Sequence, residues 1–335
     1  MTSSAAGSAT GVRRVMVTGA TGFVGRALVA QLVASGTVEV VACTRRNPLH
    51  PVAQAHYLNT GEMDRQTDWL SALAGVQTIV HTAARVHVLN ERVTEPLAAF
   101  QRVNVDATLR LAQQAAAAGV QRFVFLSSVG VNGVQTPAGT VFSEADTPEP
   151  HNAYAQSKLE AEIGLSRLHE QTGLEVVIIR PPLVYGPGVK ANFAALMRAV
   201  HHGWPLPLGS VHNQRSLVAL DNLIDLIIVC ISHPQAANET FLVSDGCDVS
   251  IVELVQGLAR AAGVPARLLP FPTWMLRAAT QMLGQRELWQ RLCGNLQVDI
   301  SKARSVLQWE PQISVEEGLR RAVADDPHLS AVRSP

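Results

Sequence analysis

Tyr154 and Lys158 stand four positions apart at the start of a segment with helical periodicity. Residues at i and i+4 of a helix project from one face, a turn apart. A phenol can give a proton to a carbonyl oxygen or take one from an alcohol, but its free pKa of about 10 is too high for base work at neutral pH. A nearby ammonium lowers that pKa. Such a pair is common on helix surfaces, yet it is also suited to proton transfer at an oxygen.

Two serines, Ser127 and Ser128, end an apolar run that is typical of a strand. Ligands of open parallel sheets bind at the carboxyl ends of the strands. There the Ser128 hydroxyl would hydrogen-bond a reacting oxygen and hold it near the Tyr154 phenol. The sequence therefore predicts a catalytic set of Ser128, Tyr154 and Lys158, with the phenol as acid or base.

The segment from Val15 to Gly25 reads as a strand, a glycine-rich turn and a helix start, with Gly19, Gly22 and Gly25 three residues apart. This spacing lets a backbone approach a pyrophosphate at a helix N-terminus. Expected contacts to a dinucleotide come from Gly19, Thr21, Gly22, Phe23, Val24, Gly25, Thr44, Ser127 and Lys158, of which Lys158 would hold the nicotinamide ribose.

Arg45 and Arg46 follow the second expected strand, where an acidic residue would bind the ribose 2′-OH of NAD. Guanidinium groups suit a 2′-phosphate instead. We therefore expect NADP(H) to be preferred over NAD(H), with two merely solvated arginines as the alternative.

These residues need a scaffold, and the hydrophobic pattern supplies one. Short β-branched runs at 14–18, 38–43, 78–81, 122–127 and 176–180 alternate with helical patterns at 24–35, 68–73, 98–118 and 153–172. This alternation predicts an α/β fold with a Rossmann-type, doubly wound parallel sheet. A smaller C-terminal, substrate-binding α/β domain is expected to follow it.

Changes in amino-acid composition along the chain suggest where it divides into domains. Residues 1–11 read as a disordered leader, 12–185 as the dinucleotide-binding domain and 186–335 mostly as the substrate-binding domain. The boundary near Tyr185 is soft, because segments within 216–243 could return to the first sheet. The apolar stripe from Trp274 to Leu283 is expected to pack against the protein rather than to attach it to a membrane.

Composition excludes several classes. Lys plus Arg and Asp plus Glu number 27 each, so the molecule as a whole lacks the basic field that nucleic acid binding demands. Four cysteines lie far apart without metal-ligand spacing, so neither a metal site nor a disulfide framework is expected. No apolar run reaches the length of a membrane span. A cytoplasmic protein with small-molecule partners fits best.

The chain resembles the extended short-chain dehydrogenase/reductase family and, within it, the NAD-dependent epimerases, reductases and dehydratases of nucleotide sugars. The likeness runs from about Val12 to about Leu319. Its carriers are the TGATGFVG turn, the strand end Val80-His-Thr-Ala-Ala84, Asn104, the Ser127-Ser128 pair, Tyr154 with Lys158, and Arg180-Pro-Pro-Leu-Val-Tyr-Gly-Pro187.

The resemblance implies further site residues. Ala83 and Ala84 would line the cofactor, Asn104 would brace the site, and Glu62-Met63 would lie beside the adenine. On the substrate side it implies Asn192, Phe193 and Arg215, the last as a diphosphate ligand unless it is an exposed loop cation. A homodimer joined by a four-helix interface is also implied.

Two departures from the family pattern bear on the reaction. Leu183 replaces an asparagine that precedes Val-Tyr-Gly-Pro in relatives, which removes a polar substrate contact. Val129-Gly130 stands where sugar dehydratases carry an acidic pair, so elimination of water lacks its acid and base.

The resemblance thus implies an NAD(P)-dependent oxidoreductase acting at C4 of a UDP-sugar. The sequence leads us to expect a UDP-4-keto-6-deoxy-N-acetylhexosamine 4-reductase, of the kind that forms UDP-N-acetylquinovosamine for surface polysaccharide. A 4-epimerase of UDP-glucose or UDP-N-acetylglucosamine is the nearest alternative. A further alternative is a flavonoid- or steroid-type reductase or dehydrogenase, whose substrate belongs to a different class. A non-catalytic NADP-sensing protein would be expected to lose Tyr154 or Lys158.

Overall fold

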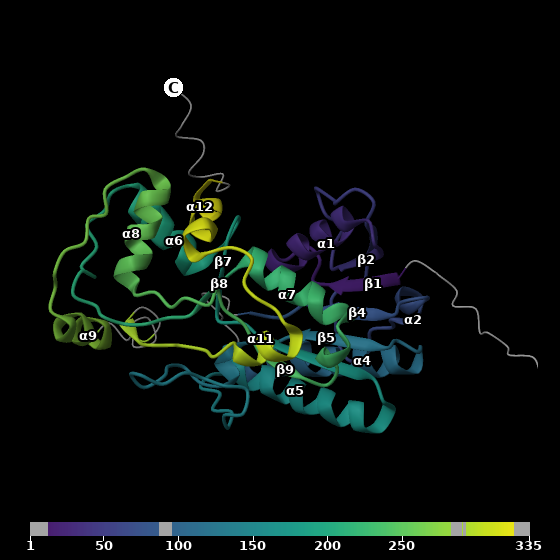
Figure 1. Cartoon of the computed structure of the whole chain (residues 1–335). Coiled ribbons are helices and arrows are strands. Elements are labelled where there is room, and N and C mark those ends of the chain that lie inside the picture. The colour runs from purple at the N-terminus through teal and green to yellow at the C-terminus, as the bar shows by residue number, and fades with distance from the viewer. Residues whose placement is uncertain (1–12, 87–95, 283–289, 291–292, 325–335) are drawn as a thin grey trace, which may run out of the picture.

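The structure is a computed structural model that describes residues 13–86, 96–282, 290 and 293–324. Seven strands form one sheet in the order β3-β2-β1-β4-β5-β6-β9, and every neighbouring pair is parallel (Figure 1). The strands are β1 (Arg13–Thr18), β2 (Val38–Thr44), β3 (His56–Asn59), β4 (Thr78–His81), β5 (Arg122–Leu126), β6 (Glu175–Arg180) and β9 (Thr240–Leu242). The expected Rossmann-type sheet is confirmed.

Strand β1 shows why the centre of this sheet is apolar on both faces. Val15 and Val17 belong to one buried hydrophobic cluster and Met16 to another, because successive side chains of a strand point to opposite faces. A parallel sheet covered by helices on both sides needs such continuous apolar runs.

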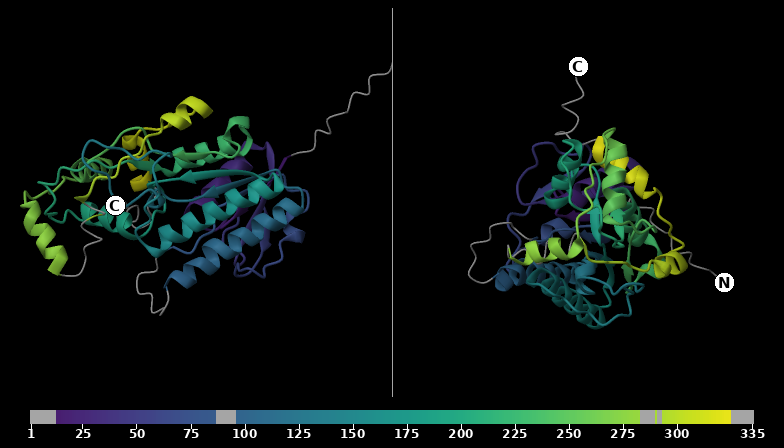
Figure 2. Two further views of the ribbon diagram at one scale, coloured as in Figure 1. Left: turned by 90° about the horizontal axis from the view of Figure 1, so that it is seen from below. Right: turned by 90° about the vertical axis from the view of Figure 1, so that its left-hand side faces the viewer.

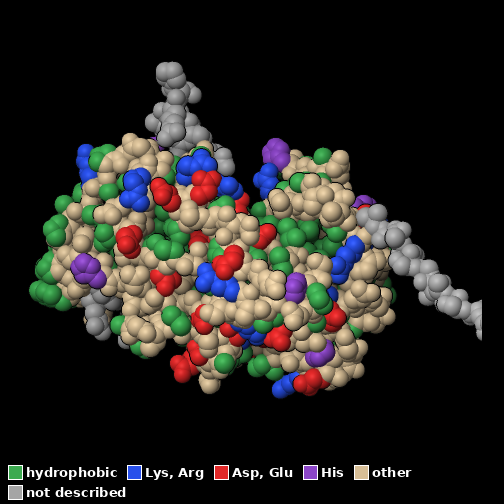
Figure 3. Space-filling view, viewed as in Figure 1, with side chains coloured by type: hydrophobic (Ala, Val, Ile, Leu, Met, Phe, Trp, Pro, Cys, Tyr) green, Lys and Arg blue, Asp and Glu red, His purple; other side chains and the backbone are tan. Residues whose placement is uncertain are grey.

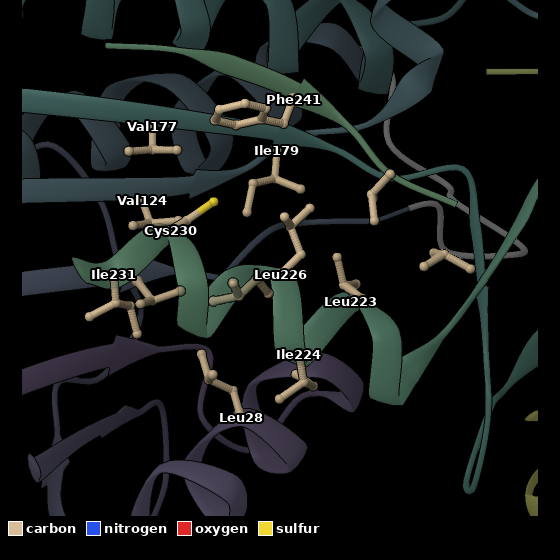
Figure 4. Packing of buried hydrophobic residues seen from close by; sticks show 14 of the residues in the cluster. Leu28, Val124, Val177, Ile179, Leu223, Ile224, Leu226, Cys230, Ile231 and Phe241 are labelled. Carbon is tan, nitrogen blue, oxygen red and sulfur yellow. The ribbon is translucent and has the colours of Figure 1, made fainter. Parts of the chain in front are cut away.

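Helices cover both faces. α1 (Phe23–Ser35) and α7 (Leu220–Ser232) pack on one face, whereas α2 (Leu70–Leu73), α4 (Ala107–Ala117) and α5 (Ala153–Thr172) pack on the other. Figure 4 shows Leu226 and Cys230 of α7 directed toward Val124, Val177 and Ile179 of the strands. These contacts hold α7 on the main sheet, although residues 181–219 come between β6 and α7 in the sequence.

The single helix expected over 98–118 proves to be three segments. α3 (Pro96–Phe100) leads into a π-helical segment, η1 (Gln101–Asp106), and then into α4. π-Helical turns are frequent at functional sites, and this one carries the buried Asn104. Strand β3 was not expected, because its four residues form a short, partly exposed edge strand without an apolar run.

After β6 the chain builds a second hydrophobic core. β7 (Leu183–Tyr185) and β8 (Leu217–Ala219) pair in parallel, and α6 (Ala191–His201), α8 (Ile251–Ala262) and α12 (Val315–Ala324) pack around them. We call this part, with α9 (Thr273–Met282), the small lobe. Figure 2 shows it at the end of the molecule opposite β2 and β3. The chain returns to the main sheet between β8 and α8, where it forms α7, η3 (Pro234–Ala236) and β9. It does so again later with α11 (Ser301–Leu307).

A buried polar cluster joins the two parts. The Tyr185 hydroxyl of β7 donates to Asp245 Oδ2 at 2.7 Å, and Asp245 Oδ1 accepts from Ala219 N at 2.8 Å and Asn222 Nδ2 at 2.7 Å. Burial raises the pKa of both Tyr185 and Asp245. Each of these polar atoms has a hydrogen-bond partner, which offsets part of the cost of burying the Asp245 carboxyl, and the cluster fixes β7 and β8 against α7.

One expectation about the surface is met only in part: Leu276 of the apolar stripe packs against the core of the small lobe, and Leu283 lies outside the described residues. The stripe that begins at Trp274 was expected to pack, but in its described part Trp274 is 70% and Met282 89% exposed. Among the described helices, none combines the length and apolarity needed to span a bilayer.

Candidate active site

The glycine-rich turn between β1 and α1 has the shape that a pyrophosphate requires. Gly19 takes a positive φ of 69°, and an added Cβ there would lie 2.7 Å from Ala83 N. A Cβ on Gly25 would lie 2.2 Å from Gly19 O, whereas one on Gly22 would meet only Gly19 O at 3.1 Å. Gly22 caps α1 without a side-chain hydrogen bond, so the cap leaves the first-turn amides available. The turn therefore fits a dinucleotide.

Two alanine substitutions separate the structural from the binding role of these glycines. Gly25→Ala is expected to destabilise the fold by roughly 1–3 kcal/mol, because its Cβ overlaps the Gly19 carbonyl. Gly22→Ala, the matched control, is expected to cost less stability and yet raise the NAD(H) dissociation constant about tenfold or more, since its Cβ faces the pyrophosphate side. Urea denaturation and cofactor fluorescence titration measure the two effects. Equal losses of stability in both variants would contradict this division.

The residues expected around the adenine lie at the ends of β2 and β3. Thr44 is buried at the end of β2, and Arg45 and Arg46 are exposed after it. Neither guanidinium forms an ion pair within the part of the chain that the structure describes. Glu62 lines an open pocket of about 400 Å³, whereas Met63 packs against the core behind β2. The Met63 side chain is thus already used in packing, and Glu62 remains available to a ligand.

Asn104 ties three elements together. It is 1% exposed, its Oδ1 accepts from Arg85 N at 2.8 Å, and its Nδ2 donates to Arg85 O at 3.1 Å and to Ser157 Oγ at 3.0 Å. The loop after β4, which contains Ala83 and Ala84, is thereby fixed to η1 and to α5. Asn104 thus holds the loop after β4 in place, and its role toward a bound cofactor stays a prediction.

Lys158 holds its side chain against β5. It is 2% exposed, and Nζ donates to Leu126 O at 2.8 Å while lying 4.4 Å from the centroid of the Phe125 ring. Burial lowers the pKa of Lys158 to about 7, and the carboxylate of Glu162, one turn further along α5, partly opposes that shift. The Lys158 amine therefore gains or loses its charge near neutral pH. It does so beside Leu126, which precedes Ser128 by two residues.

Tyr154 lies in the first turn of α5, whose start is fixed by Asn152. The Asn152 Oδ1 accepts from Ala155 N at 2.8 Å and so caps the helix. The Tyr154 ring is half-buried and meets Phe100 edge-on, with centroids 6.1 Å apart. Burial raises the pKa of Tyr154 to about 12. The phenol is therefore protonated, ready to act as an acid, until a positive charge approaches it.

Ser128 follows β5 in an extended conformation and caps a short 3₁₀ turn, η2 (Val129–Val131), by accepting from Gly130 N at 3.1 Å. This turn packs on the start of α5, since a Cβ on Gly130 would lie 3.4 Å from Ala155 Cβ. The fold thus brings the segments that carry Ser128, Tyr154 and Lys158 side by side. Ser127 is different: its hydroxyl donates to buried Glu162. A cofactor contact from Ser127 would have to use its backbone.

A buried ion pair close to Ser127 and Lys158 was not expected from the sequence. Arg180 at the end of β6 donates to Glu162 through Nη2 at 2.5 Å and Nε at 3.1 Å, and its Nη1 donates to Asn132 Oδ1 at 3.1 Å. Both charged side chains are almost fully buried. The pair therefore joins α5, β6 and the η2 turn. The one signal in the sequence was a glutamate four residues after Lys158, on the same helical face.

His81 at the end of β4 is fully buried between polar neighbours. Nδ1 lies 2.8 Å from Thr18 Oγ1 and Nε2 3.0 Å from Thr108 Oγ1. Burial, with a smaller contribution from the charge of Lys158, lowers the pKa of His81 to about 3. The imidazole is therefore neutral in the folded protein at any ordinary pH.

This burial predicts an acid-labile fold. As the pH falls from about 6.5 to 3, the unfolded chain binds a proton at His81 that the folded protein does not bind. The free energy of unfolding should therefore decrease by up to about 1.4 kcal/mol for each unit by which the pH is lowered. Denaturation by urea at a series of pH values measures the slope. His81→Gln, which keeps a donor and an acceptor but does not titrate, should flatten it, and an unchanged slope would assign the lability to other groups.

On the substrate side, Arg215 is held by main-chain carbonyls. Its Nη1 donates to Gly294 O at 2.9 Å and to Gln290 O at 3.4 Å, and its own backbone pairs with Val249. Arg215 is thus fixed between chain segments rather than extended from a loop. Leu183, at the position of the missing asparagine, is 42% exposed.

Asn192 and Phe193 begin α6 but face different surroundings. Asn192 is exposed, whereas Phe193 is 5% exposed and stacks on Tyr185 with centroids 5.5 Å apart. The Phe193 ring therefore serves the core of the small lobe, and a substrate contact from this residue would have to come from its backbone.

The four cysteines are free thiols, with Cys43 and Cys230 buried. Within residues 13–86, 96–282, 290 and 293–324, no group of three or more His, Cys, Asp or Glu side chains is arranged to hold a metal ion.

Comparison with known proteins identifies the family. The model of the NAD dependent epimerase/dehydratase family matches residues 15–244. A Vibrio cholerae protein named UDP-glucose 4-epimerase is 44% identical over 312 residues, covering 92% of this chain and 94% of its own. GDP-6-deoxy-D-mannose reductase of Pseudomonas aeruginosa is 27% identical, covering 93% and 97%.

Among solved structures, MoeE5 in complex with UDP-glucose and NAD superimposes with a TM-score of 0.73 at 26% identity, covering 92% of this chain and 97% of its own. The sequence similarity, the fold and the glycine-rich turn all indicate the same family. The resemblance inferred from the motifs is confirmed, and the chain belongs to the NAD dependent epimerase/dehydratase family.

Proposed function

We propose that this enzyme is a UDP-hexose 4-epimerase that keeps its nicotinamide cofactor bound through the cycle. The observation that carries the proposal is the 44% identity to the Vibrio cholerae UDP-glucose 4-epimerase along almost the whole of both chains. The comparisons thereby favour the epimerase over the 4-reductase that the sequence led us to expect.

The site residues support oxidation and reduction at one carbon. The bound nicotinamide would take up and return the hydride. Tyr154 would accept the hydroxyl proton during oxidation and give it back during reduction, with Ser128 holding the same oxygen. A cationic ring and the Lys158 ammonium would lower the Tyr154 pKa from about 12 and so allow the base step.

Dehydration finds no support in this site. Val129 and Gly130, which follow Ser128, form the 3₁₀ turn η2, and Val129 is buried. No carboxylate is present at these two positions to remove a proton or to protonate a leaving hydroxyl. Redox chemistry at C4 without elimination is therefore the activity we propose.

The decisive experiment uses purified enzyme without added cofactor. UDP-glucose, UDP-galactose and their N-acetylated forms are supplied separately, and inversion at C4 is followed by chromatography. Conversion in both directions supports the epimerase. Absence of inversion, together with stoichiometric NADPH oxidation by UDP-4-keto sugars, would replace it with the reductase.

The 4-reductase remains the second candidate, because Arg45 and Arg46 stand exposed where NAD-specific enzymes carry an acidic residue. The double variant Arg45→Ala/Arg46→Ala is expected to raise the KM for NADPH about tenfold or more and to leave that for NADH nearly unchanged, because only NADPH carries the 2′-phosphate. Arg167→Ala, an exposed cation on α5, is the control. Equal effects on both cofactors would contradict a 2′-phosphate role and with it NADP(H) preference.

The small lobe is proposed to bind the UDP part of the substrate, with Arg215 and Asn192 as contacts, and the dimer through α4 and α5 remains a prediction. Thermal stabilisation by UDP tests this substrate class, since a ligand that binds the folded state raises its stability. Lack of stabilisation by UDP would favour a flavonoid or steroid substrate instead.

A further inference from the structure

The outward side of α9 is mostly apolar, with Gln281 as an exposed polar residue among its apolar side chains. Trp274, Ala278 and Met282 recur every four residues, and Met275 lies beside them on the helix. Trp274 is 70%, Met275 39% and Met282 89% exposed, whereas Leu276 on the opposite side packs against the core of the small lobe. Surface helices of globular proteins normally present polar residues outward. α9 is therefore arranged for an apolar environment outside the protein.

This apolar surface continues onto two neighbouring loops. Leu206 N donates to Arg267 O and Leu269 N to Leu206 O, each at 2.8 Å, so the segment after α6 runs beside the segment that leads into α9. Trp204 is 61% and Leu269 50% exposed. Together, the exposed side chains of Trp204, Leu269, Trp274, Met275 and Met282 form what we call the α9 surface. Figure 3 shows hydrophobic side chains reaching the exterior at this end of the molecule.

The segments that supply the α9 surface carry cations and no acidic residue. Residues 176–220 and 254–286, which supply α6, α9 and the two loops, contain no aspartate or glutamate, although the chain as a whole is balanced at 27 and 27. Arg198 and Arg267 are exposed, and neither forms an ion pair with another described residue. His202 stands exposed near Trp204, with ring centroids 5.9 Å apart. Unneutralised cations thus border exposed aromatic and aliphatic side chains.

We propose that the α9 surface docks the protein on an anionic phospholipid bilayer. A short amphipathic helix with tryptophan and methionine outward lies in the interfacial plane of a membrane, and flanking cations bind anionic headgroups. None of the described helices can span a bilayer, so the attachment is peripheral. A second copy of this chain is a poorer occupant, because two such surfaces would place like charges together.

The position of α9 allows this docking. Figures 1 and 2 place α9 at the far end of the small lobe, away from β2 and β3. The same lobe holds Arg215. Docking would therefore bring the substrate side of the enzyme near the membrane and leave the main sheet in solution.

Sedimentation with vesicles tests the proposal on the full chain. Vesicles of equal parts phosphatidylglycerol and phosphatidylcholine are compared with vesicles of phosphatidylcholine alone. We expect binding to the anionic vesicles and at least about tenfold weaker binding to the neutral ones. Trp274→Ser/Met282→Ser should weaken binding at least about tenfold, because both side chains would insert. Arg198→Glu/Arg267→Glu should do the same and remove the salt dependence.

Matched controls make the result specific. Leu49→Ser, which replaces a side chain 93% exposed on the dinucleotide-binding side, and Arg167→Glu on α5 should leave vesicle binding unchanged. Circular dichroism should show that the variants fold, since all replaced side chains are exposed. Failure of the wild type to sediment with anionic vesicles would overturn the proposal. So would a loss of binding in Leu49→Ser equal to that in the α9 double variant, or a change from dimer to monomer as the only effect of the α9 double variant.

Discussion

Tyr154→Phe is expected to lower kcat by about 10²–10⁴, because it removes the phenol that we propose as the proton acceptor and donor for the reacting oxygen. Cofactor affinity should be nearly unchanged, since the phenol acts on the substrate oxygen rather than on the dinucleotide. Steady-state assays with UDP-hexoses, combined with fluorescence titration of NAD(H), measure both quantities.

The control for this substitution is Tyr57→Phe. Tyr57 lies on edge strand β3, and its hydroxyl accepts from Val52 N at 3.1 Å, far along the sheet from α5. It should keep its turnover. If Tyr154→Phe also retained more than about a tenth of wild-type turnover, the proton would have to come from another group.

Glu162→Leu is expected to reduce the free energy of unfolding by about 3–5 kcal/mol, because it strands the buried Arg180 guanidinium without its counter-charge. The Ser127 hydroxyl would lose its acceptor at the same time. Urea denaturation measures the loss. Glu39→Leu is the matched control: the Arg14–Glu39 pair is of similar length, 3.0 Å, but exposed, so its removal should cost less than about 1 kcal/mol.

The ion pair should also influence the pKa of Lys158. The Glu162 carboxylate raises the pKa of Lys158 against the effect of burial, so Glu162→Gln should lower that pKa further and shift the pH profile of kcat toward acid. The double variant Glu162→Leu/Arg180→Met should recover part of the stability lost by Glu162→Leu, because it removes both charges. If the double variant lost as much stability as Glu162→Leu and Arg180→Met, each measured alone, lose in sum, the ion pair would not be the source of the loss.

Much of the architecture followed from periodicity. Strands β1, β4 and β5 are short, mostly apolar runs. A parallel sheet that is buried on both faces requires such runs, because nearly every side chain of its strands is buried. Glycines spaced three apart after β1 predicted the close approaches now seen at Gly19 and Gly25. Edge strand β3 and the π-helical segment η1 were missed, because both depend on hydrogen bonds to neighbouring elements rather than on apolar spacing.

The candidate site divides in the same way. The sequence by itself determined that Tyr154 and Lys158 share a helical face, since spacing along one helix is a local property. The tertiary structure decided what each one meets: burial against Phe125 and Leu126 for Lys158, and Glu162 as the acceptor for Ser127.

The same distinction applies to the surface. The chain shows its two acid-free stretches in the linear sequence, but only folding places α6, α9 and their loops at one end of the molecule. Local propensity and spacing act within a few residues and can be read directly. Burial, electrostatic environment and surface charge arise from contacts between segments distant in the chain, and those exist only once the chain has folded.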